Sequence, residues 1–198
     1  YASGPQWAQI IAQEDGTTVE VQPTVDLPGG VDVLAAPHND VTTYTLDAGE
    51  VLQWEAPLDS TQQQRLLMEM SGSILLSNKP IAFMGGNAYM CLKSATSTGG
   101  GCDSDHEQIP AVSALGNEYV AAPYATRSGN GKSESIVYRI VGAVDGTSLT
   151  YDPPLPSAPT KLGRGQWLEF EATQAFVIKS QGPTHPFFVG QMMSGSTL

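Results

Sequence analysis

The sequence predicts an all-β domain with an antiparallel, β-sandwich-like architecture. Glycine and proline make up about 18% of the 198 residues, against about 12% in an average protein, and they are spread along the chain as turn residues. Short β-branched and aromatic runs lie between them. Several runs alternate with period 2, as in Thr17–Val21, where Val19 and Val21 share a face. Such alternation is typical of strands with one buried face.

The first half of the chain contains eight such runs, each bounded by Gly, Pro, Asn, Asp or another turn-forming residue. They lie at Ala8–Ala12, Thr17–Gln22, Val31–Leu34, Val41–Leu46, Val51–Glu55, Leu66–Met70, Ile74–Leu76 and Ile81–Met84. One stretch, Ser60–Met70, has a Gln, Arg and Leu content that also fits a short helix. We expect strands at all eight runs, and a helix at Ser60–Met70 is the alternative for the sixth.

The second half contains six further runs of the same type. They lie at Tyr119–Ala122, Ile136–Val141, Ser148–Tyr151, Trp167–Glu171, Phe176–Lys179 and Phe187–Val189. In Trp167–Glu171 the apolar Leu168 and Phe170 face one way and the two glutamates face the other, which predicts a sheet with one buried side.

Three blocks of the first half recur in the same order in the second half. Gln13–Pro23 corresponds to Ala143–Pro153, Leu46–Ala56 to Leu162–Ala172, and Ile74–Phe83 to Val177–Phe188. This order predicts two related β-modules from an internal duplication, at residues 1–90 and 119–198, with a cysteine-containing insert at 91–118. We expect the modules to pack as one structural unit within a larger protein.

The second module opens with the run at 119–122, which lies before Tyr124-Ala125-Thr126, the counterpart of Tyr1-Ala2-Ser3, and has no counterpart of its own in the first module. The comparison therefore predicts that the parent protein continues upstream with such a strand.

The charge balance excludes some classes of partner. The chain has nine Lys and Arg residues and twenty Asp and Glu residues, which gives a net charge of −11. Thinly spread cations cannot neutralise a phosphate backbone, so we expect no nucleic-acid binding. Since no apolar run approaches the roughly 20 residues that span a bilayer, we expect no membrane insertion.

The two cysteines, Cys91 and Cys102, lie across a polar loop. Their spacing predicts a disulfide, and closing a loop of this size would contribute roughly 3 kcal/mol. The alternatives are a zinc site that combines both cysteines with His106 and a carboxylate, and two free thiols. A disulfide would place the protein in an oxidising compartment, so we expect it to be secreted or on a cell surface.

The motifs around the cysteines resemble the IgG Fc-binding protein N-terminal domain family. The resemblance covers about residues 8–193. In order, it rests on Ser77–Ala82, Gly85–Asn87, Cys91, Cys102-Asp103, His106–Val112, Leu115–Val120 and Tyr138–Thr147. It implies an extracellular, non-enzymatic domain of the kind found in a mucus protein and in large bacterial surface proteins. It also implies the disulfide between Cys91 and Cys102.

The chain departs from the pattern that we associate with this family at three places. Ser104-Asp105 separates Cys102-Asp103 from His106, Ala111 replaces the second proline, and Leu115 replaces a tryptophan. These changes fit a bacterial or divergent member. Because the family name records the activity of one member, the resemblance does not by itself assign antibody binding.

The acidic stretch after Cys102 is the densest cluster of ligand-type side chains. Asp103, Asp105 and Glu107 are candidate calcium ligands, because hard cations take carboxylate oxygens, and a solvated acidic loop is the alternative. The candidate binding residues beside them are His106, Gln108 and Tyr89.

We therefore expect a non-enzymatic adhesion domain that recognises a protein or a glycan through exposed loops. The alternatives are a calcium-stabilised assembly module of a surface fibre and a secreted glycan-active enzyme. Trp7, Trp54 and Trp167 could stack on sugars, although core packing is the commoner role of tryptophan in a strand.

Overall fold

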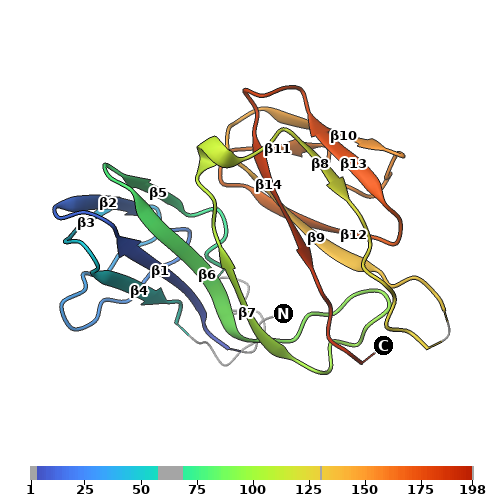
Figure 1. Cartoon of the computed structure of the whole chain (residues 1–198), viewed down its shortest axis with the longest axis horizontal. Helices are drawn as coiled ribbons and strands as arrows, with labels where there is room; N and C mark the ends of the chain where they lie inside the picture. Colours follow the sequence, from blue (N-terminus) through green and yellow to red (C-terminus); the bar gives the residue numbers. More distant parts are fainter. Residues whose placement is uncertain (1–3, 58–68, 130, 198) are drawn as a thin grey trace. The chain divides into compact units, whose positions relative to one another are not determined.

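The structure is all-β, as the sequence predicts (Figure 1). It is a computed structural model, and it describes residues 4–57, 69–129 and 131–197. The strands are antiparallel, and the short 3-10 helix η2 (Val112–Ala114) lies between β7 and β8. Their bounds are β1 Gln6–Ala12, β2 Thr17–Gln22, β3 Thr42–Leu46, β4 Val51–Glu55, β5 Ile74–Ser77, β6 Ile81–Met90, β7 Asp103–Gln108, β8 Glu118–Ala121, β9 Ile136–Gly142, β10 Thr147–Asp152, β11 Lys161–Leu162, β12 Trp167–Ala172, β13 Phe176–Ser180 and β14 Phe187–Met192.

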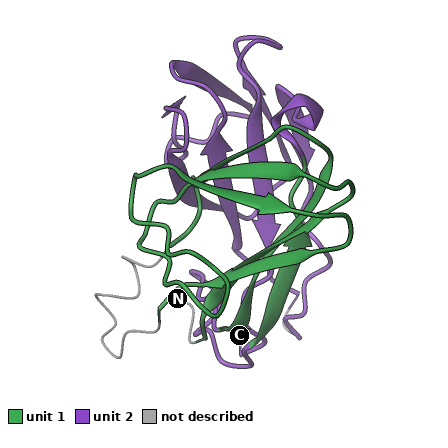
Figure 2. Ribbon diagram, turned by 90° about the vertical axis from the view of Figure 1, so that its left-hand side faces the viewer, with its two compact units in different colours: residues 1–90, 103–110 green, residues 91–102, 111–198 purple. Residues whose placement is uncertain are grey.

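The chain forms two compact units and passes between them more than once (Figure 2). Unit 1 contains residues 1–90 and 103–110, and unit 2 contains residues 91–102 and 111–198. The stretch 91–118 is therefore shared: its central part belongs to unit 1 and its two ends belong to unit 2.

Unit 1 has two sheets, with strand orders β4-β1-β6-β7 and β3-β2-β5. Residues of both sheets join one buried cluster, which includes Ile10, Val19, Val21, Leu52 and Trp54. The strands β1, β2, β3 and β4 contribute every second residue to this cluster, because successive side chains of a strand point to opposite faces. This is the packing of a β-sandwich.

Unit 2 also has two sheets, with orders β12-β9-β14 and β11-β10-β13-β8. Its core is aromatic: Tyr138, Phe170 and Phe176 contact one another with ring centroids 4.9–5.7 Å apart. Offset and edge-on contacts at such distances stabilise a core beyond the apolar area that they bury.

Six strands of each unit follow the same order. β4-β1-β6 corresponds to β12-β9-β14, and β3-β2-β5 corresponds to β11-β10-β13. The turns match as well: Gly16 and Gly146 have φ of 64° and 69°. The next residue in each, Thr17 or Thr147, is fully buried and donates its hydroxyl to the backbone carbonyl three residues earlier, at 2.7 Å and 3.0 Å. Glycine is the residue that adopts this positive φ at no steric cost.

Two details differ from the sequence prediction. The predicted strand Val31–Leu34 is wrong, because residues 27–36 form a small hairpin with bridges Leu27↔Ala36 and Gly30↔Val33, and Asp32 turns at φ 63°. The predicted loop at 103–108 is the strand β7. The predicted strand or helix at 60–70 lies outside the described residues except for Glu69 and Met70.

Candidate functional site

The acidic stretch after Cys102 forms the edge strand β7, which pairs with β6. The register is Met84↔Gln108, Gly85↔Glu107, Gly86↔His106 and Asn87↔Asp105, with an irregularity before Met90↔Asp103. All six side chains of β7 are exposed. The strand is therefore attached by backbone hydrogen bonds and by the disulfide that precedes it.

Cys91 and Cys102 form the predicted disulfide, with Cα atoms 4.4 Å apart. Cys91 follows the last residue of β6 and Cys102 precedes the first residue of β7, and Met90 pairs with Asp103. The disulfide thus closes the β6–β7 hairpin next to its last strand pair. A zinc site that uses both cysteines is wrong, because sulfurs joined in a disulfide are not thiolate ligands.

The register places the candidate calcium ligands and the candidate binding residues on opposite faces of β7. Asp103, Asp105 and Glu107 alternate along one face, and His106 and Gln108 lie on the other. Among the residues that the structure describes, no group of three or more His, Cys, Asp or Glu side chains is arranged to hold a metal ion. Calcium binding stays a prediction.

His106 and Gln108 share a sheet face with residues far away in the sequence. His106 lies opposite Gly86, and Gly86 lies opposite Trp7. This face points away from the unit 1 core, since Ile10 and Phe83 lie on its other side. We call it the outer face, and its residues include Trp7, Gln9, Gln53, Glu55, Met84, His106 and Gln108.

Gly86 of β6 leaves room for the indole of Trp7. A Cβ atom at Gly86 would lie 2.8 Å from Cζ2 of Trp7 and 2.2 Å from the carbonyl oxygen of Asp105. The indole therefore covers the glycine, one strand away from His106. Close approach of two groups to a backbone is a common reason for glycine in a strand.

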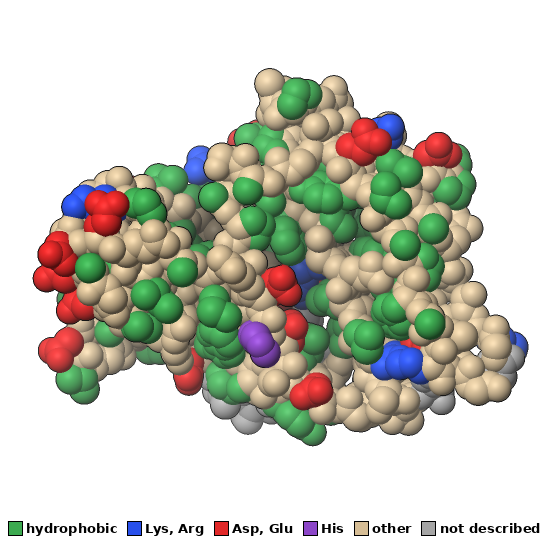
Figure 3. Space-filling model, viewed as in Figure 1, with side chains coloured by type: hydrophobic (Ala, Val, Ile, Leu, Met, Phe, Trp, Pro, Cys, Tyr) green, Lys and Arg blue, Asp and Glu red, His purple; other side chains and the backbone are tan. Residues whose placement is uncertain are grey.

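The outer face combines an aromatic ring with hydrogen-bonding groups. Gln9 donates its amide to Gln53 Oε1 at 2.9 Å, and Gln53 donates to Glu55 at 3.3 Å. Figure 3 shows hydrophobic side chains gathered beside a histidine over β6 and β7, with charged side chains scattered around them. Aromatic rings next to polar groups are typical of protein interfaces.

The other two tryptophans are occupied by contacts within their own units. Trp54 is 2% exposed, and its indole N–H donates to the Tyr44 hydroxyl at 3.2 Å. The guanidinium of Arg139 lies 4.7 Å above the Trp167 ring. Trp7 is partly buried, and of the three tryptophans it is the one that shares a sheet face with the predicted binding residues His106 and Gln108. The sequence names Trp7 as a candidate but does not place it on a face with His106 and Gln108, because that placement depends on the sheet order β1-β6-β7.

Tyr89, the remaining predicted binding residue, lies near the end of β6 and is half exposed. Its backbone carbonyl accepts a hydrogen bond from the Gly4 N–H at 2.8 Å. It lies in the irregular part of the β6–β7 ladder, where no strand pair is formed, so the register does not place it on the outer face.

The loop between the cysteines is held within unit 2 by polar contacts. Glu171 accepts hydrogen bonds from the Ala95 N–H and the Ser135 hydroxyl, at 2.8 and 2.5 Å. The Gly195 N–H donates to the Leu92 carbonyl at 2.9 Å, and the Thr197 N–H donates to the Gly100 carbonyl at 3.1 Å. Residues 195–197 thus pair with the loop that the disulfide closes.

Unit 2 also contains an ion pair with a buried carboxylate, between Arg127 and Glu134. Glu134 is 4% exposed, and Arg127 binds its carboxylate through Nη2 at 2.5 Å. The hydrogen bonds from Arg127 lower the pKa of Glu134, against the effect of burial, and the same contact raises the pKa of Arg127. A carboxylate held charged in this way is a structural partner rather than a proton donor.

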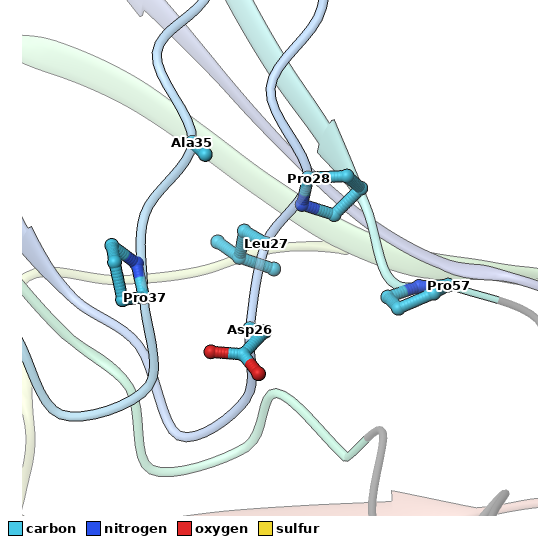
Figure 4. A pocket seen from close by; sticks show the side chains of 6 residues that line it. All are labelled: Asp26, Leu27, Pro28, Ala35, Pro37 and Pro57. Atoms are coloured by element: carbon cyan, nitrogen blue, oxygen red, sulfur yellow. The ribbon is translucent and has the colours of Figure 1, made fainter.

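A shallow depression of about 290 Å³ lies beside the 27–36 hairpin (Figure 4). Its lining is mostly apolar and comprises Asp26, Leu27, Pro28, Ala35, Pro37 and Pro57. The carboxylate of Asp26 accepts a hydrogen bond from the His38 N–H at 2.8 Å. One carboxylate among prolines offers no acid–base pair, so this lining does not support catalysis.

The comparisons with known proteins give one match. The family model described as IgGFc binding protein matches residues 1–197. No curated protein and no solved structure matches the chain. In the described part of the chain, no helix has the length and apolarity needed to cross a membrane.

Proposed function

Because the chain belongs to the IgGFc binding protein family, we propose that it is a non-enzymatic binding domain of a secreted or cell-surface protein and that its outer face recognises a protein ligand. The observation that carries the proposal is the row Trp7–Gly86–His106, which crosses three neighbouring strands. The disulfide Cys91–Cys102 supports an oxidising compartment.

The chemistry of the outer face suits a protein surface. Trp7 offers a large apolar area at low entropic cost, and tryptophan is enriched among the residues that dominate binding energies. Gln9, Gln53 and Gln108 can each donate and accept hydrogen bonds. Backbone groups are also available at the edge of β7. The Ile109 N–H donates to the Phe83 carbonyl at 2.9 Å, and the backbone groups of successive residues point to opposite sides of a strand. The N–H and C=O groups of His106 and Gln108 therefore point away from β6, toward the free edge.

The two faces of β7 provide a matched test. We would measure binding of the whole chain to immobilised Fc fragment of IgG by surface plasmon resonance, since the family description names that ligand. His106→Ala/Gln108→Ala should weaken binding about tenfold, which is the effect of losing about 1.4 kcal/mol of contact energy. Asp105→Ala/Glu107→Ala alters the same strand on its other face and should change binding less than twofold.

Each alternative predicts a different outcome. Equal loss in both double variants would assign the ligand to the edge or the acidic face rather than to the outer face. Failure of Fc to bind would contradict antibody recognition, and a glycan array would then test the glycan alternative. A rise in melting temperature with calcium, abolished by a chelator, would support the calcium-stabilised assembly module.

We also propose that the two units arose by internal duplication within an adhesion or mucin-type protein. Two observations support this origin: six strands have the same order in both units, and the same Asp-Gly-Thr turn occurs at 15–17 and at 145–147. Further correspondence lies in the next turn, where Asp15 Oδ1 accepts from the Ala48 N–H at 2.9 Å and Asp145 Oδ1 accepts from the Arg164 N–H at 2.8 Å.

A further inference from the structure

The two units differ at one sheet edge. In unit 2, β13 lies between β10 and β8. Its counterpart in unit 1 is β5, which pairs with β2 and has no second neighbour among the strands of the described residues. An edge of this kind presents backbone N–H and C=O groups that can pair with another extended chain.

The registers show which backbone groups face this edge. Val19 pairs with Ser77 in unit 1, and Leu149, at the matching place in β10, pairs with Ser180 in unit 2. The Ser180 N–H donates to the Asn117 carbonyl, at the start of β8, at 2.8 Å. In unit 1 the Asn78 N–H bonds the Thr18 carbonyl at 3.2 Å, so Leu75 and Ser77 direct their backbone groups to the free edge. Ser77 therefore has the orientation that Ser180 uses to bond the added strand.

The apolar side chains show what the free edge lacks. In unit 2, Tyr119 of β8 lies opposite Ile178, and its ring contacts Phe187 edge-on with centroids 5.1 Å apart. Ile178 and Phe187 are both 0% exposed. Their counterparts by register in unit 1, Leu75 and Ile81, are only partly buried. Two positions of the unit 1 core thus lack the cover that a strand such as β8 provides.

The position next to Leu75 on β5 indicates which side chain a strand paired with this edge should carry. In unit 2, Lys179 lies opposite Glu118 and forms an ion pair with it at 2.9 Å. The counterpart of Lys179 is Leu76, an apolar residue that is 56% exposed. A strand that fits β5 should therefore carry an apolar residue where β8 has Glu118.

From these contacts we infer that the β5 edge binds an extended peptide strand of the β8 type, antiparallel to β5, with an aromatic residue opposite Leu75 and an apolar residue opposite Leu76. Backbone pairing supplies the general affinity, and the two side-chain positions supply the specificity, as in other cases of strand addition. The site is separate from the outer face, so its test is independent of the proposed function.

The test uses the whole chain and three synthetic peptides. The first has the sequence of residues 115–123, the second carries Val at the position of Glu118, and the third adds Ala at the position of Tyr119 to the second. Isothermal titration should give the tightest binding for the second peptide and about tenfold weaker binding for the third, because it lacks the aromatic ring. Hydrogen exchange with mass spectrometry should show protection at β5.

Two variants of one residue provide the control. Ser77→Pro removes the N–H that faces the free edge without altering a bond to β2, and proline is tolerated in this orientation at a sheet edge. Ser77→Ala keeps the N–H. The second peptide should bind the alanine variant like the unmodified chain and should not bind the proline variant, and circular dichroism melts would confirm that both fold.

Three results would overturn the inference. The first is no binding of any peptide up to about 1 mM, a concentration that detects affinities of about −4 kcal/mol. The second is equal binding to the two Ser77 variants, or protection at β13 in place of β5. The third is concentration-dependent self-association that only Ser77→Pro abolishes, which would make a second copy of the chain the occupant.

Discussion

Removal of the disulfide should release β7 before it unfolds the rest of the molecule. The strand buries none of its six side chains, so backbone bonds to β6 and the disulfide are what attach it. We consider the variant Cys91→Ser/Cys102→Ser, which keeps the size of both side chains and cannot form the cross-link.

The magnitude follows from the length of the closed loop. The cysteines are 11 residues apart, and loop-closure entropy for that length is about 3 kcal/mol at 25 °C. When β7 separates from β6 in the unmodified chain, the loop between the cysteines stays closed by the disulfide, so this conformational entropy is not regained. In the variant it is regained, so opening of β7 should become about 100-fold more frequent.

Hydrogen exchange with mass spectrometry measures this opening directly. A peptide covering residues 103–109 should exchange about 100-fold faster in the variant, whereas one covering β2 should change little. Unmodified protein treated with a reducing agent should behave like the variant. Unchanged exchange at 103–109 would show that backbone pairing alone holds β7 and would refute this reasoning.

Three further predictions test contacts in the two units. Tyr44→Phe should lower the free energy of unfolding by about 1–3 kcal/mol in urea titrations, because a buried indole N–H loses its acceptor, whereas the same change at the exposed Tyr89 should cost under about 0.5 kcal/mol. Gly86→Ala should cost about 1–3 kcal/mol, since its Cβ would lie 2.2 Å from a carbonyl oxygen, and Gly30→Ala, with nothing within 4 Å, should be neutral; equal costs would contradict the geometry. The lowered pKa of Glu134 means that its stabilising contribution is present above about pH 4.5 and is lost as pH falls through the lowered value. Melting temperatures between pH 3 and 7 should show this loss, and Glu134→Gln should lack it and be less stable at pH 7.

The elements with a buried face could be predicted from the sequence. Val19 and Val21 alternate with polar residues and are fully buried, and the Asp-Gly-Thr turns at 15–17 and 145–147 lie where the sequence places them. In each case the local signal and the tertiary environment agree. Glycine is required by the positive φ, and the period-2 pattern matches the sheet.

The sequence could not predict β7, because that strand has no buried face and hence no alternation of polarity. It also could not bring Trp7 to His106, since their proximity depends on β6 lying between β1 and β7. The strand predicted at Val31–Leu34 is wrong for a related reason. The β-branched side chain of Val31 suggests a strand, but it is 91% exposed at the tip of a hairpin, and Asp32 rather than a glycine adopts the positive φ of the turn.

The alternation of the chain between the two units sets an order of events during synthesis. A polypeptide emerges from the ribosome from its N-terminus, and unit 1 lacks one strand of its larger sheet until residues 103–110 have followed. By then residues 91–102, which belong to unit 2, have already emerged, and the rest of that unit has not. The cysteine pair becomes complete one residue before β7 begins, so oxidation can close the hairpin at the moment when its second strand first becomes able to pair.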